Sequence, residues 1–350
     1  MAKVDFKIGL NIGVQSGQGT ENDTIEGSTT LSSVFGVSDT GAILGHPESG
    51  EGRSGISFAT SRGHSEKAEV TGSFTKNPSD FLREEITSFS VAVPLKGSGK
   101  TAAGPADSDM TPYAGIDAIL QALGLTGAAV AGGDNGWVYT PNNSGVVYCT
   151  AKLWANGVVW VLEDCVASGS MAFEPNGIGL LTADFSVGAV TSFAEAAFPT
   201  SITYESQATL SATPITGVVH TFGTARGFSD FTLNFDNAIE SVADSNSSVG
   251  TVPEQTARTI SATTTIYADS ADDNFEWEQM TLSAAPSSEC TFTAGTVAVN
   301  AAEVNAYTVS LTSPEVRSVT PKRIGNKLAH ELELVCVDET ADTEFSFTFV

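Results

Sequence analysis

The amino-acid sequence predicts a mainly β protein, a β-sandwich or barrel with one flanking α-helix. Short segments rich in Val, Ile, Thr and Phe alternate apolar with polar residues along much of the chain, as half-buried strands do. Asn-Gly pairs separate some of these segments and favour tight hairpin turns. With 350 residues, of which 41% are hydrophobic, the chain can bury a sizeable core in one large domain or two ordinary ones.

An extended segment at Ile86–Leu95 comes first, and a helix at 112–123 follows it. Thr111 is a suitable N-cap, and Pro112 suits the first helical position. Gly124 ends the helix. The stripe at i, i+3, i+4 and i+7 consists of Ile116, Ile119, Leu120 and Leu123. We expect this stripe to lie against a sheet.

A meander of three or four antiparallel strands is expected over Gly145–Val187. Asn156-Gly157 separates the β-rich segments VVYCTAKLWA and VVWVLEDC, and Pro175-Asn176-Gly177 separates GSMAFE from IGLLTADFSV. Two β-rich segments around an Asn-Gly pair are the strongest short-range signal of a hairpin, since both turn positions need positive φ.

The second half of the chain contains further alternating segments. Their inward positions are expected to be Phe231, Leu233 and Phe235; Ile260, Ala262, Thr264 and Ile266; Tyr307, Val309 and Leu311; and Leu328, His330, Leu332 and Leu334. The C-terminal segment EFSFTFV places Phe345, Phe347 and Phe349 on one face, which must be buried by the same subunit or by another. A weaker helical pattern covers Asp272–Met280.

The order of these elements repeats. An extended segment, a helix and then strands follow one another around the helix at 112–123 and again from Thr259–Ala268 onward. We therefore hypothesise two tandem domains, at 51–200 and 201–350, after an N-terminal arm and loop region at 1–50. The boundary would lie near Pro199–Pro214, a stretch rich in Ser and Thr.

The chain ends and the cysteines indicate a cytosolic setting. Residues 1–20 contain no long apolar run, which predicts no secretory signal, and the longest apolar stretches are strand-length, which predicts no membrane span. The cysteines are widely spaced, at Cys149, Cys165, Cys290 and Cys336. Buried thiols in a reducing compartment are the favoured interpretation; a zinc site or a structural disulfide is the alternative.

Motifs that resemble catalytic or nucleotide-binding sites lack essential parts. The sequence Gly97–Thr101 ends like a P-loop, but Pro94 stands where the first glycine is needed and no helix pattern follows. Acidic residues at 272–273 lack the turn glycine of an EF-hand because Trp277 stands there, which leaves only weak calcium binding as an alternative.

Isolated carboxylate pairs and histidines carry no catalytic pattern. The pairs are Glu84-Glu85, Glu163-Asp164 and Asp272-Asp273, and the histidines are His46, His64, His220 and His330. His330 falls on an apolar face, where we expect a packed core residue. We predict no catalytic, cofactor-binding or metal-binding residues, and therefore a protein that is not an enzyme.

The chain is strongly acidic, with 41 Asp and Glu against 16 Lys and Arg and a net charge of -25. This balance argues against gripping DNA or an anionic membrane, because phosphate contacts need a basic face. Between residues 101 and 316 the only basic residues are Lys152, Arg226 and Arg258. Apart from Lys3 and Lys7, the others gather in two clusters, Arg53, Arg62, Lys67, Lys76, Arg83, Lys96 and Lys100, and Arg317, Lys322, Arg323 and Lys327. The pattern fits either an ordinary solvated surface or a self-complementary one, whose head-to-tail contacts would form rings or filaments.

An ordered series of segments from about Gly52 onward resembles the tail tube proteins of long-tailed bacteriophages, such as siphoviruses. The segments are SFSVAVPLKGSG (Ser88–Gly99), YAGIDAILQALGL (Tyr113–Leu125), the meander with its approach (Val138–Val187), FSDFTLNFDNAIESV (Phe228–Val242), ARTISATTTIYA (Ala257–Ala268) and SLTSPEVRSVTPKRIGNKLAHELELVCV (Ser310–Val337). The N-terminal fifty residues match less clearly.

The resemblance implies a structural virion protein with no catalytic motif and no cofactor. It implies a tail-tube fold that self-assembles into stacked rings, a helical tube with an acidic channel for DNA ejection. Homotrimeric, pseudo-hexameric rings are favoured and hexameric rings come second, because members with two tandem tube domains form trimers. Further expected partners are the tape measure, terminator and distal tail proteins, in a virion assembled in the host cytoplasm without a membrane. DNA would pass without specific binding.

The resemblance also suggests assembly contacts. The meander at Gly145–Val187 is the candidate for a lumen-lining hairpin, and the N-terminal arm and the end at Val350 are candidates for strand exchange. Two other functions stay open: a bacterial surface or pilus-like β-sandwich, which should carry a signal peptide, and a glycan-binding or glycan-active β-sandwich, which should show a cleft with exposed Trp.

Overall fold

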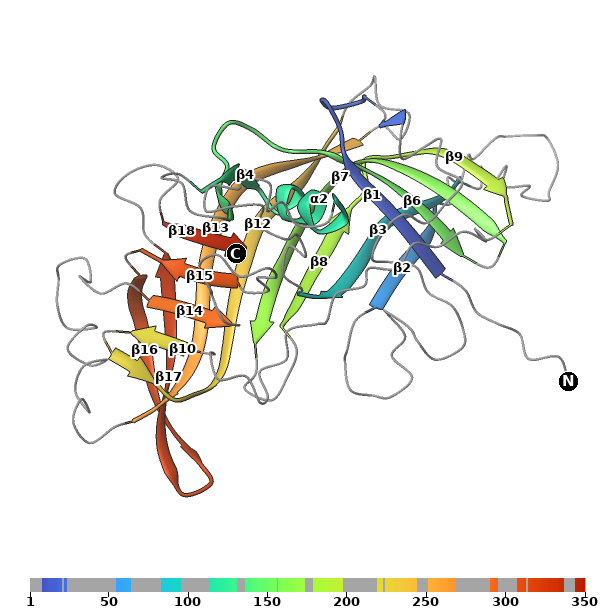
Figure 1. Ribbon diagram of the computed structural model, residues 1–350. Coiled ribbons are helices and arrows are strands. Elements are labelled where there is room, and N and C mark those ends of the chain that lie inside the picture. Colours follow the sequence, from blue (N-terminus) through green and yellow to red (C-terminus); the bar gives the residue numbers. More distant parts are fainter. Residues whose placement is uncertain are drawn as a thin grey trace, which may run out of the picture.

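The structure is a computed structural model that describes residues 8–20, 22–23, 55–63, 83–95, 114–130, 136–155, 157–173, 179–197, 219–222, 224–243, 251–268, 290–294, 307–312, 314–336 and 344–349. Antiparallel strands and the helix α2 (Ala114–Ala122) make up nearly all of these residues. The prediction of a mainly β fold with a flanking helix is confirmed (Figure 1).

The larger of two sheets has eleven strands, eight of which follow one another as β16-β17-β13-β12-β7-β8-β3-β2. Their bounds are β2 Gly55–Gly63, β3 Arg83–Pro94, β7 Val158–Phe173, β8 Leu180–Ser186, β12 Phe228–Ala243, β13 Thr251–Tyr267, β16 Pro314–Ile324 and β17 Lys327–Cys336. Every adjacent pair in this series is antiparallel.

Strand β7 borders four strands, because it is long enough to serve two parts of the sheet. Its first half pairs with β6 (Cys149–Ala155) and β9 (Ala189–Glu195), and its second half pairs with β8 and β12. Strand β1 (Ile8–Val14) extends the first part by pairing with β6. The expected meander is therefore confirmed as β6-β7-β8, with Gly157 at φ 91° in the first turn.

The second sheet has seven strands in the order β11-β10-β14-β15-β18-β5-β4. Their bounds are β4 Leu125–Ala129, β5 Trp137–Pro141, β10 Val219–Phe222, β11 Thr224–Arg226, β14 Cys290–Ala294, β15 Tyr307–Leu311 and β18 Phe345–Phe349. The C-terminal strand β18 pairs with both β15 and β5, so it joins the two halves of the chain.

Aromatic side chains fill the space between the sheets. Phe173 of the large sheet lies with its ring centroid 4.5 Å from that of Phe292 and 5.4 Å from that of Tyr307, both on the small sheet. Phe235 meets Phe345 edge to face at 5.6 Å. The Phe345, Phe347 and Phe349 face is at most 1% exposed, so the same subunit buries it.

Helix α2 (Ala114–Ala122) covers the core face of the large sheet next to β1 and β7 (Figure 1). The predicted stripe is fully buried, and Gly124 follows it at φ 84°. Inside the helix Asp117 accepts hydrogen bonds from the Tyr139 hydroxyl at 2.6 Å and from Gln121 at 2.8 Å. Burial, and next the charge of Asp117, raise the pKa of Tyr139 far above its usual value.

The expected inward positions of the later strands are buried with one exception. Leu328 is 53% exposed, although His330, Leu332 and Leu334 on the same strand are at most 4% exposed. The prediction for Leu328 is wrong because it lies beside the turn of the β16–β17 hairpin, which extends past the end of β13 at Tyr267.

The eight-strand series divides into two groups with the same order. Read across the sheet, the first group is β2-β3-β8-β7 and the second group is β12-β13-β17-β16. In each group these neighbours are the first, second, fourth and third strands along the chain. The groups meet where β7 pairs with β12, from Phe231 opposite Phe173 to Phe235 opposite Gly169. Among the described residues, β2 and β16 are each paired on one side only.

Several predicted features lie outside the described residues. They are the helix at Asp272–Met280, the cap at Thr111 and Pro112, the glycine loop Gly97–Thr101, the boundary at Pro199–Pro214, the acidic pair Asp272-Asp273 and most of the N-terminal arm.

Candidate functional site

The candidate site is the face of the large sheet that points away from the small sheet, here called the outer face. Its residues alternate with the core positions along much of the eight-strand series, apart from the continuously buried run 161–167 of β7. Phe89, Val91 and Val93 on β3 are buried, while Ser88, Ser90 and Ala92 between them lie on the outer face. Strict alternation of this kind gives a sheet one apolar and one polar face.

Small polar residues dominate this face from one edge to the other. One row, in register across seven strands, reads Ala92, Thr182, Ser170, Asn234, Ser261, Val335 and Glu315. A second row reads Ala172, Thr232, Thr263, Glu333 and Ser318. A third reads Ser57, Ser90, Asp184 and Ser168. The result is a broad surface of hydroxyl groups with few bulky side chains.

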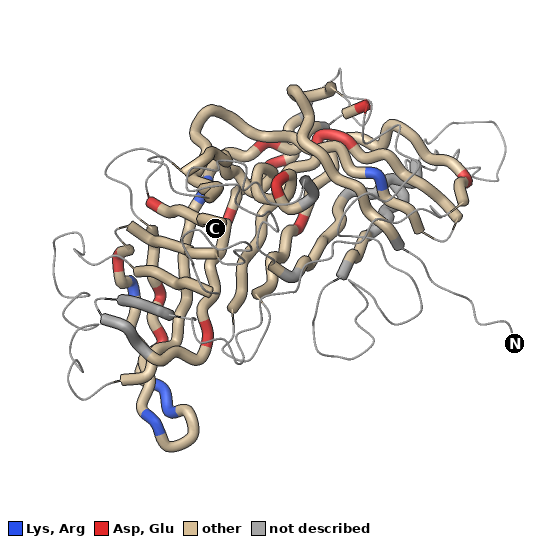
Figure 2. Tube along the Cα trace, viewed as in Figure 1, with Lys and Arg blue, Asp and Glu red and all other residues tan. Residues whose placement is uncertain are grey.

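The described charges on the outer face are mostly acidic. Asp184, Asp236 and Glu333 are exposed on it, and Glu331 is half-buried beside them. Where the structure describes side chains, the three rows contain no Lys or Arg. Figure 2 shows that described basic residues instead gather at the end of the β16–β17 hairpin, with isolated ones elsewhere. Near the β16 edge, Arg317 pairs with Glu315 and Lys322 pairs with Glu331. Over the rest of the three rows a phosphate backbone would meet acidic side chains and hydroxyl groups.

The pair Glu163-Asp164 occupies a bulge in β7, at the point where the strand passes from β6 and β9 to β8 and β12. Glu163 is 5% and Asp164 6% exposed, and Asp164 has φ 51°. The backbone N–H of Gly19 donates to Asp164 Oδ1 at 2.8 Å. Burial raises the pKa of the Asp164 carboxyl, and the Gly19 hydrogen bond opposes part of that rise. We therefore interpret this pair as a structural part of the bulge in β7.

We expect Asp164→Asn to stabilise the protein at neutral pH. A carboxyl whose pKa is raised on folding contributes stability below its unfolded pKa, and this contribution is lost as the pH rises through the folded pKa. Asparagine keeps the positive φ and the acceptor for Gly19 without a buried charge. Thermal unfolding between pH 3 and 8 should show the wild type losing stability with rising pH relative to the variant. The control Asp184→Asn, on the exposed outer face, should not reproduce this difference.

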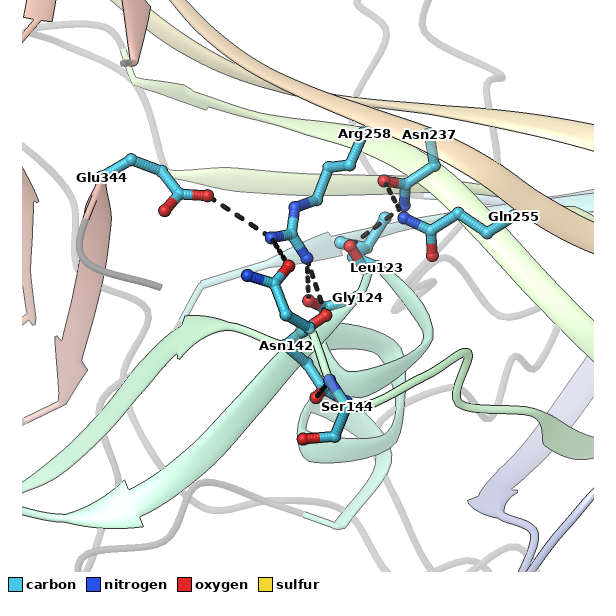
Figure 3. Close-up of polar contacts among 9 residues, drawn as sticks. Leu123, Gly124, Asn142, Ser144, Asn237, Gln255, Arg258 and Glu344 are labelled. Atoms are coloured by element: carbon cyan, nitrogen blue, oxygen red, sulfur yellow. Dashed lines mark hydrogen bonds and ion pairs between the residues drawn. The ribbon is translucent and has the colours of Figure 1, made fainter. Parts of the chain in front are cut away.

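A polar cluster, called here the helix-end cluster, surrounds the C-terminus of α2 (Figure 3). Arg258 of β13 donates to the carbonyl oxygens of Gly124 and Asn142, both at 3.0 Å, and to Glu344 Oε1 at 3.4 Å. Its side chain and that of Glu344 are each 12% exposed. The cation thus faces the negative end of the helix dipole and satisfies carbonyls that the helix leaves unpaired.

A buried amide completes the cluster. Asn237 Nδ2 donates to the carbonyl oxygens of Leu123 at 3.0 Å and Ala167 at 2.7 Å, and Gln255 Nε2 donates to Asn237 Oδ1 at 3.0 Å. Asn237 is 4% exposed. These contacts tie α2 and β7, from the first half of the chain, to β12 and β13 from the second. The cluster is structural, because each of these hydrogen bonds joins two residues of the same chain.

The cysteines and His330 are buried or partly buried, as the sequence predicts. Cys149, Cys165 and Cys290 are buried free thiols, and Cys336 is a partly buried one. Burial raises the pKa of the Cys336 thiol to about 12, and it also raises the pKa values of Cys149 and Cys165 well above the usual value. His330 is 4% exposed within β17. The described residues contain no group of three or more His, Cys, Asp or Glu that could hold a metal ion. Within them, no helix is long and apolar enough to cross a membrane.

No family model matches the chain, and no curated protein matches it in sequence. The inference of function therefore rests on the geometry of the sheet.

Sequence reasoning missed the outer face and the helix-end cluster. The outer face had a local signal, because Ser, Thr and Asn occupy the positions between the apolar residues of several strands. The cluster had a weaker one. Arg258 is an isolated cation within a long acidic stretch, but its partners lie 86 to 134 residues away in the sequence.

Proposed function

We propose that the protein is a structural subunit of a bacteriophage tail tube, which polymerises into stacked rings around an acidic channel for DNA ejection. The observation that carries this proposal is the large sheet. It presents a polar, acidic outer face, and both ends of its eight-strand series are open among the described residues. An outer face of this kind suits the wall of a channel through which DNA slides, since cationic groups would hold the phosphates and stall passage.

The repeated strand order supports a tandem duplication and suggests how a ring closes. Within the chain, the last strand of the first group, β7, pairs with the first strand of the second group, β12. The corresponding open strands are β16 and β2. If the same joint forms between copies, β16 of one copy pairs with β2 of the next, and no edge stays exposed. Three copies would then make a ring of six four-strand groups, the favoured pseudo-hexamer.

The remaining partners follow from the same proposal. The tape measure protein would occupy the channel, and terminator and distal tail proteins would close the tube at its two ends. In this function no residue acts as a catalyst, and the protein belongs to the virion after assembly in the host cytoplasm.

The direct test is negative-stain microscopy and mass measurement of the purified protein. We expect rings or tubes with a central channel, and subunit numbers per ring that are a multiple of three. A protein that stays a monodisperse monomer at high concentration would contradict the proposal. Binding to a glycan array, or a signal peptide on the natural gene, would favour one of the two alternative functions.

A disulfide scan tests the joint itself. We expect Ser57→Cys on β2 to form an intermolecular disulfide when combined with one of Ser318→Cys, Thr320→Cys or Lys322→Cys on β16, because directly opposed Cβ atoms lie about 4.5–5.5 Å apart. Under oxidation the matching pair should give a covalent ladder that ends at the number of copies in the ring, which is three for a trimer. Each single variant is the control for chance collisions. If no pair gives a ladder while tubes form, the ring closes through another surface.

A further inference from the structure

The β16–β17 hairpin presents a cationic end, here called the tip cluster, which consists of Lys322, Arg323 and Lys327. The three side chains belong to exposed residues on either side of a tight turn, where Gly325 has φ 60°. The hairpin protrudes beyond the rest of the described sheet (Figure 1), and its basic residues lie near its end (Figure 2).

The tip cluster is held in shape but only partly neutralised. Arg323 donates from Nε to the carbonyl oxygen of Gly325 at 3.0 Å, and Lys327 Nζ lies 5.0 Å from the ring centroid of Tyr267. Lys322 forms an ion pair with Glu331 at 2.7 Å. Among the described residues, no carboxylate forms an ion pair with Arg323 or Lys327. Two positive charges thus remain available at the tip of a chain whose net charge is -25.

Two neighbouring strands of the same sheet, β12 and β13, carry an unfavourable acidic pair at the end away from the tip cluster. Glu240 of β12 lies directly opposite Glu254 of β13 in the sheet register, and both are exposed. Like charges in directly opposed positions of an antiparallel pair destabilise it. Strand β13 runs from this pair to Tyr267 beside the tip cluster, a distance of about 40 Å at about 3.3 Å per residue. Each copy therefore has a cationic and an anionic end along one strand direction.

We propose that the tip cluster of one copy docks on the Glu240–Glu254 pair of a second copy. The contact joins two different surfaces, so it leaves a free tip and a free acidic pair at the ends of every chain of copies and propagates head to tail. A cation placed between the two carboxylates relieves their repulsion, and complementary charges also speed encounter. The contact rests on the self-assembly proposed above, but it uses the turn end of the β16–β17 hairpin and not the long edge along which β16 would pair with β2. It is thus the axial contact that stacks one ring on the next.

Charge reversal tests this contact with the full chain. We expect Arg323→Glu with Lys327→Glu to leave the rings intact but to shorten the tubes, to a median length about one tenth of the wild-type length or below. Glu240→Lys with Glu254→Lys should do the same. Combining all four substitutions in one chain restores both the wild-type net charge and a complementary pair of ends, so tubes should return. Microscopy gives the tube lengths, and sedimentation gives the assembled fraction.

Two further samples separate docking at the tip cluster from a general effect of net charge or of misfolding. Thr126→Glu with Ala128→Glu, on the exposed side of β4, adds the same net charge as Arg323→Gln with Lys327→Gln, and only the latter should shorten tubes. Mixing the two reversed proteins should restore association between them, as measured by light scattering, even if neither assembles alone. Wild-type tube lengths in the reversed variants, or failure of the fourfold variant and of the mixture to associate, would overturn the docking proposal. Failure of the wild type to form rings, with association retained in the mixture, would count against the tube function alone.

Discussion

Replacing Gly169 by alanine is expected to destabilise the protein by about 3 kcal/mol or more. Gly169 lies in β7 at the joint with β12, opposite Phe235 on one side and Ala183 on the other. A Cβ atom there would collide with the backbone carbonyl oxygen of Thr182, and it would lie 3.1 Å from the Cα atom of Ala183. Backbone atoms paired in a central strand cannot move aside as a flexible side chain can.

The sign of this effect is informative, because a glycine-to-alanine change inside an ordinary strand stabilises by about 0.5–1 kcal/mol. Denaturant unfolding gives the free energy of unfolding. Gly17→Ala is the control, since among the described residues a Cβ atom there would have only the Thr20 hydroxyl oxygen within 4 Å, at 3.8 Å. This variant should change stability by no more than about 0.5 kcal/mol. Equal stabilities for the two variants would mean that the joint between the two strand groups is looser than the structure shows.

Arg258→Met should lower the free energy of unfolding by about 3–5 kcal/mol, the usual consequence of removing one partner of a buried ion pair. The substitution leaves the Glu344 carboxylate and the carbonyl oxygens of Gly124 and Asn142 without their cationic donor. The control is Arg317→Met, which removes an exposed pair with Glu315 at 3.0 Å and should change stability by no more than about 1 kcal/mol.

A double-mutant cycle separates charge from packing at the same place. Adding Glu344→Gln to Arg258→Met removes the uncompensated buried charge, so part of the lost stability should return. Urea or guanidinium unfolding of the four proteins gives the coupling energy. A coupling near zero would show that Arg258 acts only through the helix-end carbonyls, and not through Glu344.

Local patterns predicted the elements, whereas the order of strands needed the structure. The helix stripe around Ile119, the turn at Gly157 and the buried face around Phe347 depend on residues close together in the sequence, and all three are confirmed. The joint between β7 and β12 links residues about 60 apart or more, and many pairings of alternating strands bury the same apolar faces.

The errors and omissions have the same origin. Leu328 continues the alternation of its strand but lies past the end of the neighbouring strand β13, and its side chain is 53% exposed. The buried environment of Glu163-Asp164 depends on Gly19, which lies 145 residues from Asp164 in the sequence. A carboxylate pair in an acidic chain gives no sign of its burial until the segments that cover it are known.

The four strands that pair with β7 are synthesised at different times, so they are expected to pair with it in a definite order. Strands β6, β8 and β9 lie within 149–195, so their pairing with β7 closes short loops and can form an early nucleus. The edge from Gly169 to Phe173 then waits for β12, which a ribosome makes more than fifty residues later. During synthesis that edge is an unpaired template open to other nascent chains, so we expect co-expression with a chaperone that covers exposed strands to raise the soluble yield.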